Sequence, residues 1–244
     1  MYRLSNFREL PEVVKNLLII NGLLFLGTIS LEKYGLNLVE YFALHQFQSI
    51  NFKPHQLITH LFMHGNFTHL FFNMFALWMF GKILENIWGA KKFLIFYMIT
   101  GIGAAFIHLG ISQYEILNLQ NQIDKHNLMI LLNEGKNILE MNQNYTNPVM
   151  GKLNLLVNTP TVGASGAVFG LLLAFGMLFP NTLLYLYFAV PIKAKYFVIG
   201  YGLLELFAGI SNNPADNIAH FAHLGGMIFG FLMIKYWQRY NTFY

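Results

Sequence analysis

The sequence predicts an all-α membrane protein, and two observations carry this prediction. Of the 244 residues, 55% are hydrophobic and only 11% are charged, whereas soluble domains carry about 25% charged residues. Apolar stretches of about 20 residues, the length that crosses a bilayer as a helix, also recur along the chain. These stretches follow one another as one unit, so we expect a single membrane domain over residues 1–244.

Composition also narrows the classes of function. The net charge is +4, but the basic residues do not cluster into a compact patch. We therefore expect no nucleic-acid partner and take the lipid bilayer as the environment of the chain. The absence of cysteine excludes disulfides, thiolate nucleophiles and cysteine-ligated metals. No small-residue cleavage site follows the first apolar stretch, which we interpret as retained rather than as a signal peptide.

Six apolar segments are expected to cross the membrane as helices. Each is bounded by polar residues, lysines or a proline. The chain between the fourth and fifth segments contains Pro191 and two lysines, and we interpret it as a connection at the membrane surface. The six segments cover approximately residues 14–31, 67–87, 93–111, 165–179, 196–210 and 218–236.

The stretch of about 112–160, between segments three and four, differs in composition. It is rich in asparagine and glutamine and too weakly hydrophobic to span a membrane. Apolar residues recur in it at roughly helical spacing, among them Leu117, Ile123, Leu128, Leu131, Ile138 and Met141. We expect an extramembrane insert in the third loop, on the outer side, with one or two amphipathic helices interrupted near Gly135.

Basic residues predict the orientation of the chain. With six crossings and a cytoplasmic N-terminus, ten of the 15 lysines and arginines lie on the cytoplasmic side, as the positive-inside rule requires. We therefore expect both termini in the cytoplasm, with a bacterial inner membrane as the location. This orientation places the start of the fourth segment near the outer face.

Polar side chains inside membrane spans are costly and are therefore candidates for function. Ser165 lies at the start of segment four in a run of small residues that leaves its hydroxyl accessible. His223 in segment six is followed by Gly226 and Gly230, a GxxxG face that allows close approach to the Gly166 side of segment four. The full set of candidates is His69, Asn73, Ser165, Glu205, His220 and His223.

A serine activated by a histidine is the minimum for covalent acyl transfer. This chemistry also needs hydrogen-bond donors for an oxyanion. His69 and Asn73 lie four residues apart on one helix face and can both donate, and the backbone N–H of Ser165 at a helix start is a further donor. No aspartate lies at membrane depth to orient His223, so the pattern predicts a Ser–His dyad rather than a triad.

Each of these residues also has an ordinary structural explanation. A lone serine or histidine within a membrane usually bonds to backbone or bridges two helices. We interpret His220 as a neighbour of His223, one turn away, and Glu205 as a group that lines a watery cavity or pairs with a polar side chain. Their joint presence near one membrane face favours the functional interpretation.

Three motifs resemble those of the rhomboid intramembrane serine proteases. The first is Gly163-Ala-Ser-Gly166, similar to the GxSG nucleophile motif of that family. The second, His69-Leu-Phe-Phe-Asn73, is similar to its HxxxN motif, and the third, Ala222-His-Leu-Gly-Gly226 continued to Gly230, to its AHxxGxxxG motif. The resemblance covers about residues 54–110 and 160–237.

This resemblance implies a rhomboid bundle of six helices and a serine endopeptidase without cofactor or metal. The implied substrates are single-pass or multi-pass membrane proteins, cut in a transmembrane segment near the outer face. It also implies Ser165 as nucleophile and His223 as general base. His69 and Asn73, with the N–H of Ser165, are the implied oxyanion donors.

Several supporting features follow from the same resemblance. Phe169 occupies a position where the family often has a tyrosine that packs on the catalytic imidazole. His60 and His64 match supporting histidines of the first loop, whose frequent Trp-Arg pair is replaced here by His55 and Gln56. The loop 211–217 is expected to cap the active-site cavity, and segment five to act as a lateral gate.

Two alternatives stay open. One is a catalytically silent rhomboid-like protein that binds transmembrane helices; such proteins typically lack the serine or the histidine, and both are present here. The other is a metal-dependent membrane protein or transporter, because the chain has enough imidazoles for a zinc site. The sequence has no HExxH motif, no cysteine and no intramembrane aspartate near these histidines, which argues against a metal site. The histidines concerned are His60, His64, His69, His220 and His223.

Overall fold

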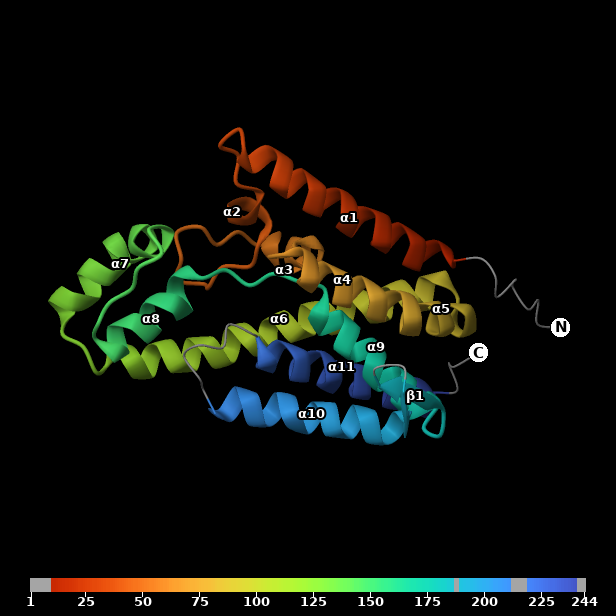
Figure 1. Cartoon of the computed structure of the whole chain (residues 1–244). Coiled ribbons are helices and arrows are strands. Elements are labelled where there is room, and N and C mark those ends of the chain that lie inside the picture. Colours follow the sequence, from red (N-terminus) through yellow and green to blue (C-terminus); the bar gives the residue numbers. More distant parts are fainter. Residues whose placement is uncertain (1–9, 187–188, 212–218, 241–244) are drawn as a thin grey trace.

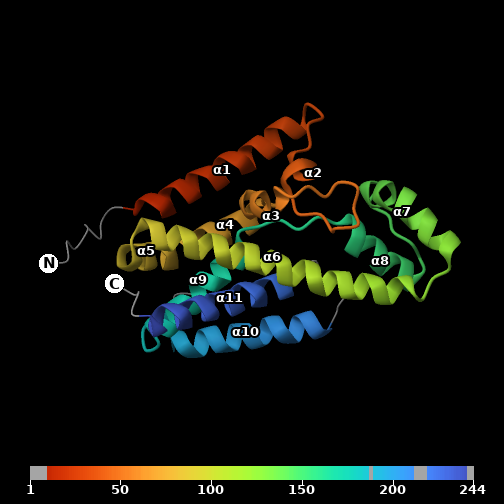
Figure 2. The same ribbon diagram turned by 180° about the vertical axis from the view of Figure 1, so that it is seen from behind.

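Long helices lie side by side along one direction in the computed structural model, which describes residues 10–186, 189–211 and 219–240 (Figure 1). In the described part of the chain, four helical stretches are long and apolar enough to cross a membrane: α1 (Glu12–Glu32), Phe67–Trp88, α6 (Ala90–Gln120) and α10 (Ala194–Ser211). This predominantly helical fold confirms the predicted all-α membrane class. α1 begins and α11 ends at the end of the bundle opposite α7 and α8 (Figures 1 and 2).

Two further helices match the remaining predicted segments. α9 (Ser165–Leu178) is apolar, and α11 (His220–Arg239) packs against both α9 and α6. Ten of the 14 residues of α9 are buried, so this helix forms the interior of the bundle. At about 1.5 Å per residue α9 is about 21 Å long, less than the roughly 30 Å of a bilayer core. The count of six spans therefore stays a prediction.

The second predicted segment is one helical stretch with a widened turn inside it. α4 (Phe67–Ala76) leads through the π-helical turn η2 (Leu77–Gly81) into α5 (Lys82–Trp88). The side chain of Asn66 caps the start of α4 by accepting a hydrogen bond from the backbone N–H of His69 at 2.8 Å. This cap fixes where the helix that carries His69 and Asn73 begins.

Glu85 of α5 caps α1 from a neighbouring element. Its two carboxylate oxygens accept hydrogen bonds from the backbone N–H groups of Val13 (2.9 Å) and Val14 (2.8 Å). Those groups have no partner within α1 itself, because they belong to its first turn. The carboxylate also faces the positive end of the helix dipole, so this contact joins the first two membrane helices.

We expect Glu85→Gln to lower the free energy of unfolding by about 1–3 kcal/mol, because one of the two N–H groups of the first turn of α1 loses its acceptor. Thermal unfolding in detergent measures the change. Glu134→Gln, an exposed position on α7, is the matched control and should leave the unfolding temperature unchanged. An unchanged unfolding temperature for Glu85→Gln would contradict the capping role.

Between α1 and α4 the chain forms three short helices: α2 (Leu38–Phe42), α3 (Gln56–Thr59) and the 3₁₀ turn η1 (His60–Phe62). Gln56 is fully buried and organises this loop. Its amide nitrogen donates to the carbonyl oxygens of Asn51 (2.9 Å) and Tyr41 (3.3 Å), and its oxygen accepts from the N–H of Lys53 (3.1 Å). The position that departs from the family's Trp-Arg pair is therefore well packed here.

The polar stretch between segments three and four is largely helical. α6 continues to Gln120, and α7 (Lys125–Glu140) and α8 (Pro148–Asn158) follow. The break expected near Gly135 is wrong, because Gly135 lies within α7, where its carbonyl oxygen accepts a hydrogen bond from Asn154 of α8 at 3.0 Å. Gly135 therefore allows close packing of α7 against α8 and does not form a turn. Whether the stretch lies outside the membrane stays a prediction.

A β-hairpin lies where the sequence predicted only a connection. β1 (Leu183–Leu186) pairs antiparallel with β2 (Val190–Lys193), with Leu183 opposite Lys193. Four-residue apolar runs do not distinguish strand from loop by periodicity, and Pro191 argued against a strand. A two-stranded hairpin has only edge strands, where proline is tolerated. The loop expected to cap the site, 211–217, lies outside the described residues apart from Ser211.

Candidate active site

Ser165 is the first residue of α9, and Gly163 shapes the turn that leads to it. The φ angle of Gly163 is +124°, a conformation that residues with a side chain rarely adopt. A Cβ atom on Gly163 would lie 2.7 Å from both Cε1 and Nε2 of His69, and 3.7 Å from Ser165 Oγ. Gly163 therefore permits the turn and lets the imidazole of His69 lie beside the chain next to Ser165.

α9 and α11 meet through their backbones. A Cβ atom on Gly226 would overlap the carbonyl oxygen of Gly166, and one on Gly230 would lie 3.2 Å from the Cα atom of Gly170. The GxxxG face of α11 thus packs against the small-residue face of α9, as small residues allow in membrane helices. This contact brings the start of α11 to the start of α9.

Ser165 and His223 are hydrogen-bonded across this contact. His223 Nε2 lies 2.9 Å from Ser165 Oγ, and His223 Nδ1 lies 2.9 Å from Oε2 of Glu205 in α10. A carboxylate only accepts hydrogen bonds, so Nδ1 carries the hydrogen and Nε2 is left to accept from the serine hydroxyl. This is the tautomer in which a histidine acts as a base toward a serine.

Glu205 pairs with a polar side chain, one of the two roles that the sequence analysis left open for it. The prediction of a Ser–His dyad considered aspartate alone as a third residue, whereas the acid beside His223 is a glutamate. Glu205 Oε2 also lies 2.6 Å from His220 Nδ1, and the Glu205 side chain is 9% exposed. A signal was available: His220 and His223 lie three apart on one helix face, and Glu205 is the acid of segment five.

Aromatic stacking fixes the plane of the His223 ring. The Phe169 ring lies parallel to it, with centroids 4.1 Å apart and an angle of 5° between the planes. Phe169 also stacks on Tyr201 of α10, with centroids 5.3 Å apart. The orientation of the His223 imidazole is therefore fixed by the stacked Phe169 ring and by hydrogen bonds at both ring nitrogens.

His69 and Asn73 lie on one face of α4, as the spacing predicts. The His69 ring packs edge-on against the His64 ring, with centroids 5.1 Å apart. Asn73 is buried, and its Nδ2 donates to the carbonyl oxygen of His69 at 3.0 Å. That bond uses one amide hydrogen and leaves the second one. The contact with Gly163 places the His69 ring beside the turn that leads into α9.

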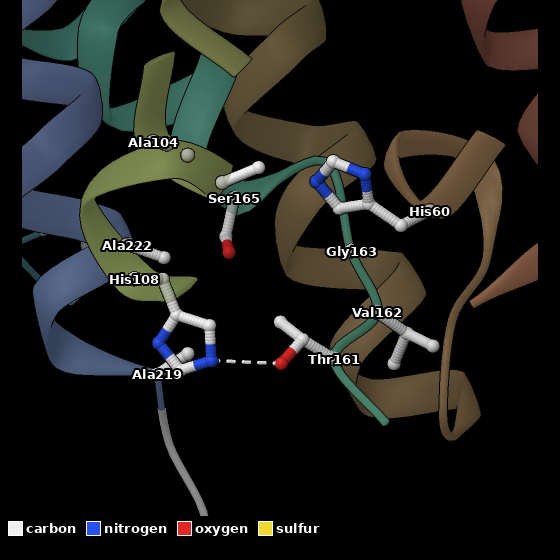
Figure 3. A pocket seen from close by; sticks show the side chains of 11 residues that line it. His60, Ala104, His108, Thr161, Val162, Gly163, Ser165, Ala219 and Ala222 are labelled. Atoms are coloured by element: carbon white, nitrogen blue, oxygen red, sulfur yellow. Dashed lines mark hydrogen bonds between the residues drawn. The ribbon is translucent and has the colours of Figure 1, made fainter. Parts of the chain in front are cut away.

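A small cavity of about 20 Å³ lies beside Ser165 (Figure 3). Figure 3 shows the Ser165 hydroxyl directed into it, facing the side chains of His108 and Thr161. His108 Nε2 lies 2.8 Å from Thr161 Oγ1, and His60 also lines the cavity. A volume of this size holds about one water molecule where polar partners are present.

His60 and His64, in the loop before α4, are buried and uncharged. Burial lowers the pKa of His60 to about 4 and the pKa of His64 to about 3. An unfolded histidine has a pKa near 6.5. Below that pH the unfolded chain takes up protons that the folded protein does not, so the free energy of unfolding falls as the pH drops.

Acidification is therefore expected to destabilise the protein, by about 2 kcal/mol per buried histidine between pH 7 and pH 5. Thermal unfolding in detergent at the two pH values measures the effect. His64→Phe keeps an aromatic ring against His69 and removes one proton site, so it should lose about 2 kcal/mol less on acidification. An equal loss in both proteins would contradict the assignment.

One group of described residues has the composition of a metal site. Glu205, His220 and His223 offer ligand atoms that all lie within 4.8 Å of one another, and imidazole and carboxylate are ligands that zinc accepts. These atoms already bond to each other, since both imidazole Nδ1 atoms share Oε2 of Glu205. The hydrogen bonds account for the cluster without an ion.

Comparisons with known proteins identify the family. The model of the rhomboid domain matches residues 51–239. The chain is 28% identical over 183 residues to rhomboid protein 1, mitochondrial, of Saccharomyces cerevisiae, covering 72% of this chain and 40% of that protein. It is 29% identical over 182 residues to RHOMBOID-like protein 12, mitochondrial, of Arabidopsis thaliana (72% and 45%). It is also 29% identical over 182 residues to the rhomboid protease AarA of Providencia stuartii (71% and 52%).

These relatives correct the expected location. Three of them are named as mitochondrial proteins, from budding yeast, Arabidopsis thaliana and Schizosaccharomyces pombe. The expectation of a bacterial inner membrane with cytoplasmic termini is therefore wrong. The distribution of lysine and arginine predicts the orientation of the helices in a membrane, but it does not identify the membrane. The chain spans about half the length of the curated relatives it matches.

The family match and the site coincide in the chain. Residues 51–239 contain α4, α9, α10 and α11, the four helices that contribute Ser165, His223 and their neighbours. One of these relatives, AarA, is named as a rhomboid protease. With the family model matched over more than three quarters of its length, this chain belongs to the rhomboid family.

Proposed function

We propose that the chain is an intramembrane serine endopeptidase that cuts transmembrane segments of membrane proteins. The observation that carries the proposal is the 2.9 Å contact between Ser165 Oγ and His223 Nε2, with the histidine in the tautomer of a base. The cut lies near the membrane face at which α9 begins. In this proposal α9 and α11 cross the bilayer together with the four long helices, in a mitochondrial membrane.

Ser165 supplies the nucleophile and His223 the base. Ser165 Oγ forms a bond to the scissile carbonyl carbon while its proton moves to His223 Nε2. The imidazolium then returns this proton to the leaving amine as the peptide C–N bond breaks, which leaves an ester on Ser165. A water molecule then attacks the ester carbon while His223 takes a proton from it. His223 returns that proton to Ser165 Oγ as the acyl C–O bond breaks, and the carboxylic acid product leaves. The cavity beside Ser165, of about 20 Å³, has room for such a water.

Three donors stabilise the negative oxygen of the tetrahedral intermediate. The backbone N–H of Ser165 lies in the first turn of α9, where a helix provides no partner. The His69 ring lies against Gly163, two residues before the serine, and Asn73 has an amide hydrogen not used by the His69 carbonyl. Their placement supports a role as oxyanion donors.

His69→Ala is expected to lower kcat about 100- to 1000-fold, the usual loss for one well-placed oxyanion donor. KM should change little, because the bond strengthens only as charge develops on the oxygen. His55→Ala, which changes a more exposed histidine in the loop before α4, is the control. A fall in substrate affinity with unchanged kcat would assign His69 to substrate binding instead.

Access for a substrate helix is supported by the packing of α10. This helix buries only three of its 18 residues, so it is the side on which a transmembrane segment can enter laterally. A helical substrate hides its peptide groups in internal hydrogen bonds, and the segment must therefore unwind before Ser165 reaches a carbonyl carbon. The small residues at the start of α9 leave room for the extended strand.

Cleavage of a defined substrate in liposomes tests the proposal. The purified chain is reconstituted with a single-pass reporter, and the fragments are located by mass spectrometry. We expect one cut within the reporter's transmembrane segment, insensitive to EDTA. Stable association with an uncut reporter would favour a rhomboid-like binder, and loss of cleavage with EDTA would favour a metal-dependent enzyme.

A further inference from the structure

The carboxylate of Glu205 has no role in a mechanism that uses only a serine and a histidine. Yet Glu205 Oε2 lies 2.9 Å from Nδ1 of His223, on the far side of the ring from Ser165. The residue comes from α10, whereas Ser165 and His223 come from α9 and α11. A buried acid is costly unless it is paired, so its place behind the base calls for an explanation.

The hydrogen bond decides which nitrogen of His223 carries the proton. A neutral imidazole has one N–H and one acceptor nitrogen. With Nδ1–H bound to the carboxylate, Nε2 accepts from the serine hydroxyl. The opposite tautomer would direct an N–H at the hydroxyl oxygen and leave no base for its proton.

The same contact favours the charged state that forms during the reaction. When His223 takes the serine proton it becomes an imidazolium, and an anionic oxygen at 2.9 Å stabilises that charge. The Glu205 side chain is 9% exposed and that of His223 is 11% exposed, so water screens the pair only weakly.

His220 holds the carboxylate in place from the other side. Its Nδ1 lies 2.6 Å from the same oxygen, Glu205 Oε2. One acceptor oxygen thus receives hydrogen bonds from two imidazoles of α11, one helical turn apart. This second bond restrains the rotation of the glutamate side chain and keeps Oε2 directed at His223.

We infer that Glu205 is a positioning residue that completes a Ser165–His223–Glu205 triad, with His220 as the donor that holds it in place. Glu205 acts through His223: it fixes the tautomer and the ring orientation and stabilises the imidazolium, while its own proton state does not change. The inference rests on the proposed protease function and goes beyond a two-residue mechanism.

The test compares Glu205→Gln, Glu205→Asp and Glu205→Ala in the liposome cleavage assay, with kcat and KM measured separately. An Asp→Asn exchange in a soluble serine protease triad lowers kcat about 10⁴-fold by enforcing the wrong tautomer. For Glu205→Gln we expect a fall in kcat of at least about 100-fold with KM within about twofold of wild type. Glu205→Asp, which keeps the carboxylate, should be clearly more active than Glu205→Gln.

Chemical rescue distinguishes positioning from a merely structural role. Glu205→Ala leaves a space that formate can fill with a carboxylate, so added formate should restore part of kcat. Formamide has the same shape without the charge and should restore nothing. Glu85→Gln is the matched control: it also removes a buried carboxylate, and it should lower stability without changing kcat.

The outcomes separate this inference from the proposed function. Ser165→Ala is assayed alongside. If Ser165→Ala is inactive while Glu205→Gln keeps kcat within about twofold of wild type, the triad is wrong and the serine protease stands. Loss of activity in all three Glu205 variants without rescue by formate would also overturn the positioning role. If Ser165→Ala cleaves at the wild-type rate, the proposed function itself fails.

Discussion

Ser165→Ala is expected to lower cleavage of a transmembrane reporter by about 10⁶-fold, the scale of loss when a serine protease loses its nucleophile. The substitution removes one oxygen atom at the start of α9 and leaves the glycine contacts between α9 and α11 intact. Because no other hydroxyl is hydrogen-bonded to His223 among the described residues, no substitute nucleophile takes its place. The measurement is the initial rate of fragment release in liposomes at matched protein amounts.

A second serine provides the control. Ser112 lies buried in α6, and Ser112→Ala removes the same atom from a different helix. This variant should cleave at the wild-type rate, and both variants should keep the wild-type unfolding temperature. Cleavage by Ser165→Ala within tenfold of wild type would contradict the assignment of the nucleophile.

Gly226→Ala is expected to separate α9 from α11 and so to impair both stability and activity. The added Cβ overlaps the carbonyl oxygen of Gly166, and backbone atoms cannot move aside as a flexible side chain does. Overpacking of this kind costs about 1–3 kcal/mol. A displacement of about 1 Å between reacting groups lowers rates about 100-fold, and the Ser165–His223 contact depends on this crossing.

Thermal unfolding and reporter cleavage together measure this effect. Gly200→Ala in α10 is the control, because a Cβ there meets nothing within 4 Å; it should keep activity and unfold at the same or a slightly higher temperature, since alanine favours helix. If Gly226→Ala kept both the wild-type rate and the wild-type unfolding temperature, the glycine crossing would not be what holds the two side chains together.

The membrane helices were largely predictable because their signal is local. The first segment was predicted at about 14–31 and α1 covers Glu12–Glu32, and the fifth at about 196–210 where α10 covers Ala194–Ser211. Long apolar runs have few competing structures. Short apolar runs are compatible with several structures, so the sequence did not predict the hairpin of β1 and β2.

The site was predictable in part for the same reason. Gly226 and Gly230 lie on the helix face of His223, so the approach of α11 to Ser165 could be inferred from spacing. Glu205 could not be placed in this way, because the rotation of α10 relative to α11 is set by tertiary packing that no spacing within one helix records. The sequence predicts a helix break near Gly135, whereas this glycine leaves room for the Asn154 side chain of a neighbouring helix. The two roles of a glycine cannot be distinguished from the sequence alone.

Mapping of a covalent adduct tests the central claim most directly. The reconstituted protein is treated with a serine-directed electrophile, and the modified residue is located by mass spectrometry. The account predicts an adduct on Ser165, formed in proportion to the loss of reporter cleavage and nearly absent in His223→Ala, where the base is missing. An unmodified Ser165 in fully inhibited protein, or equal modification without His223, would contradict a serine nucleophile activated by that histidine.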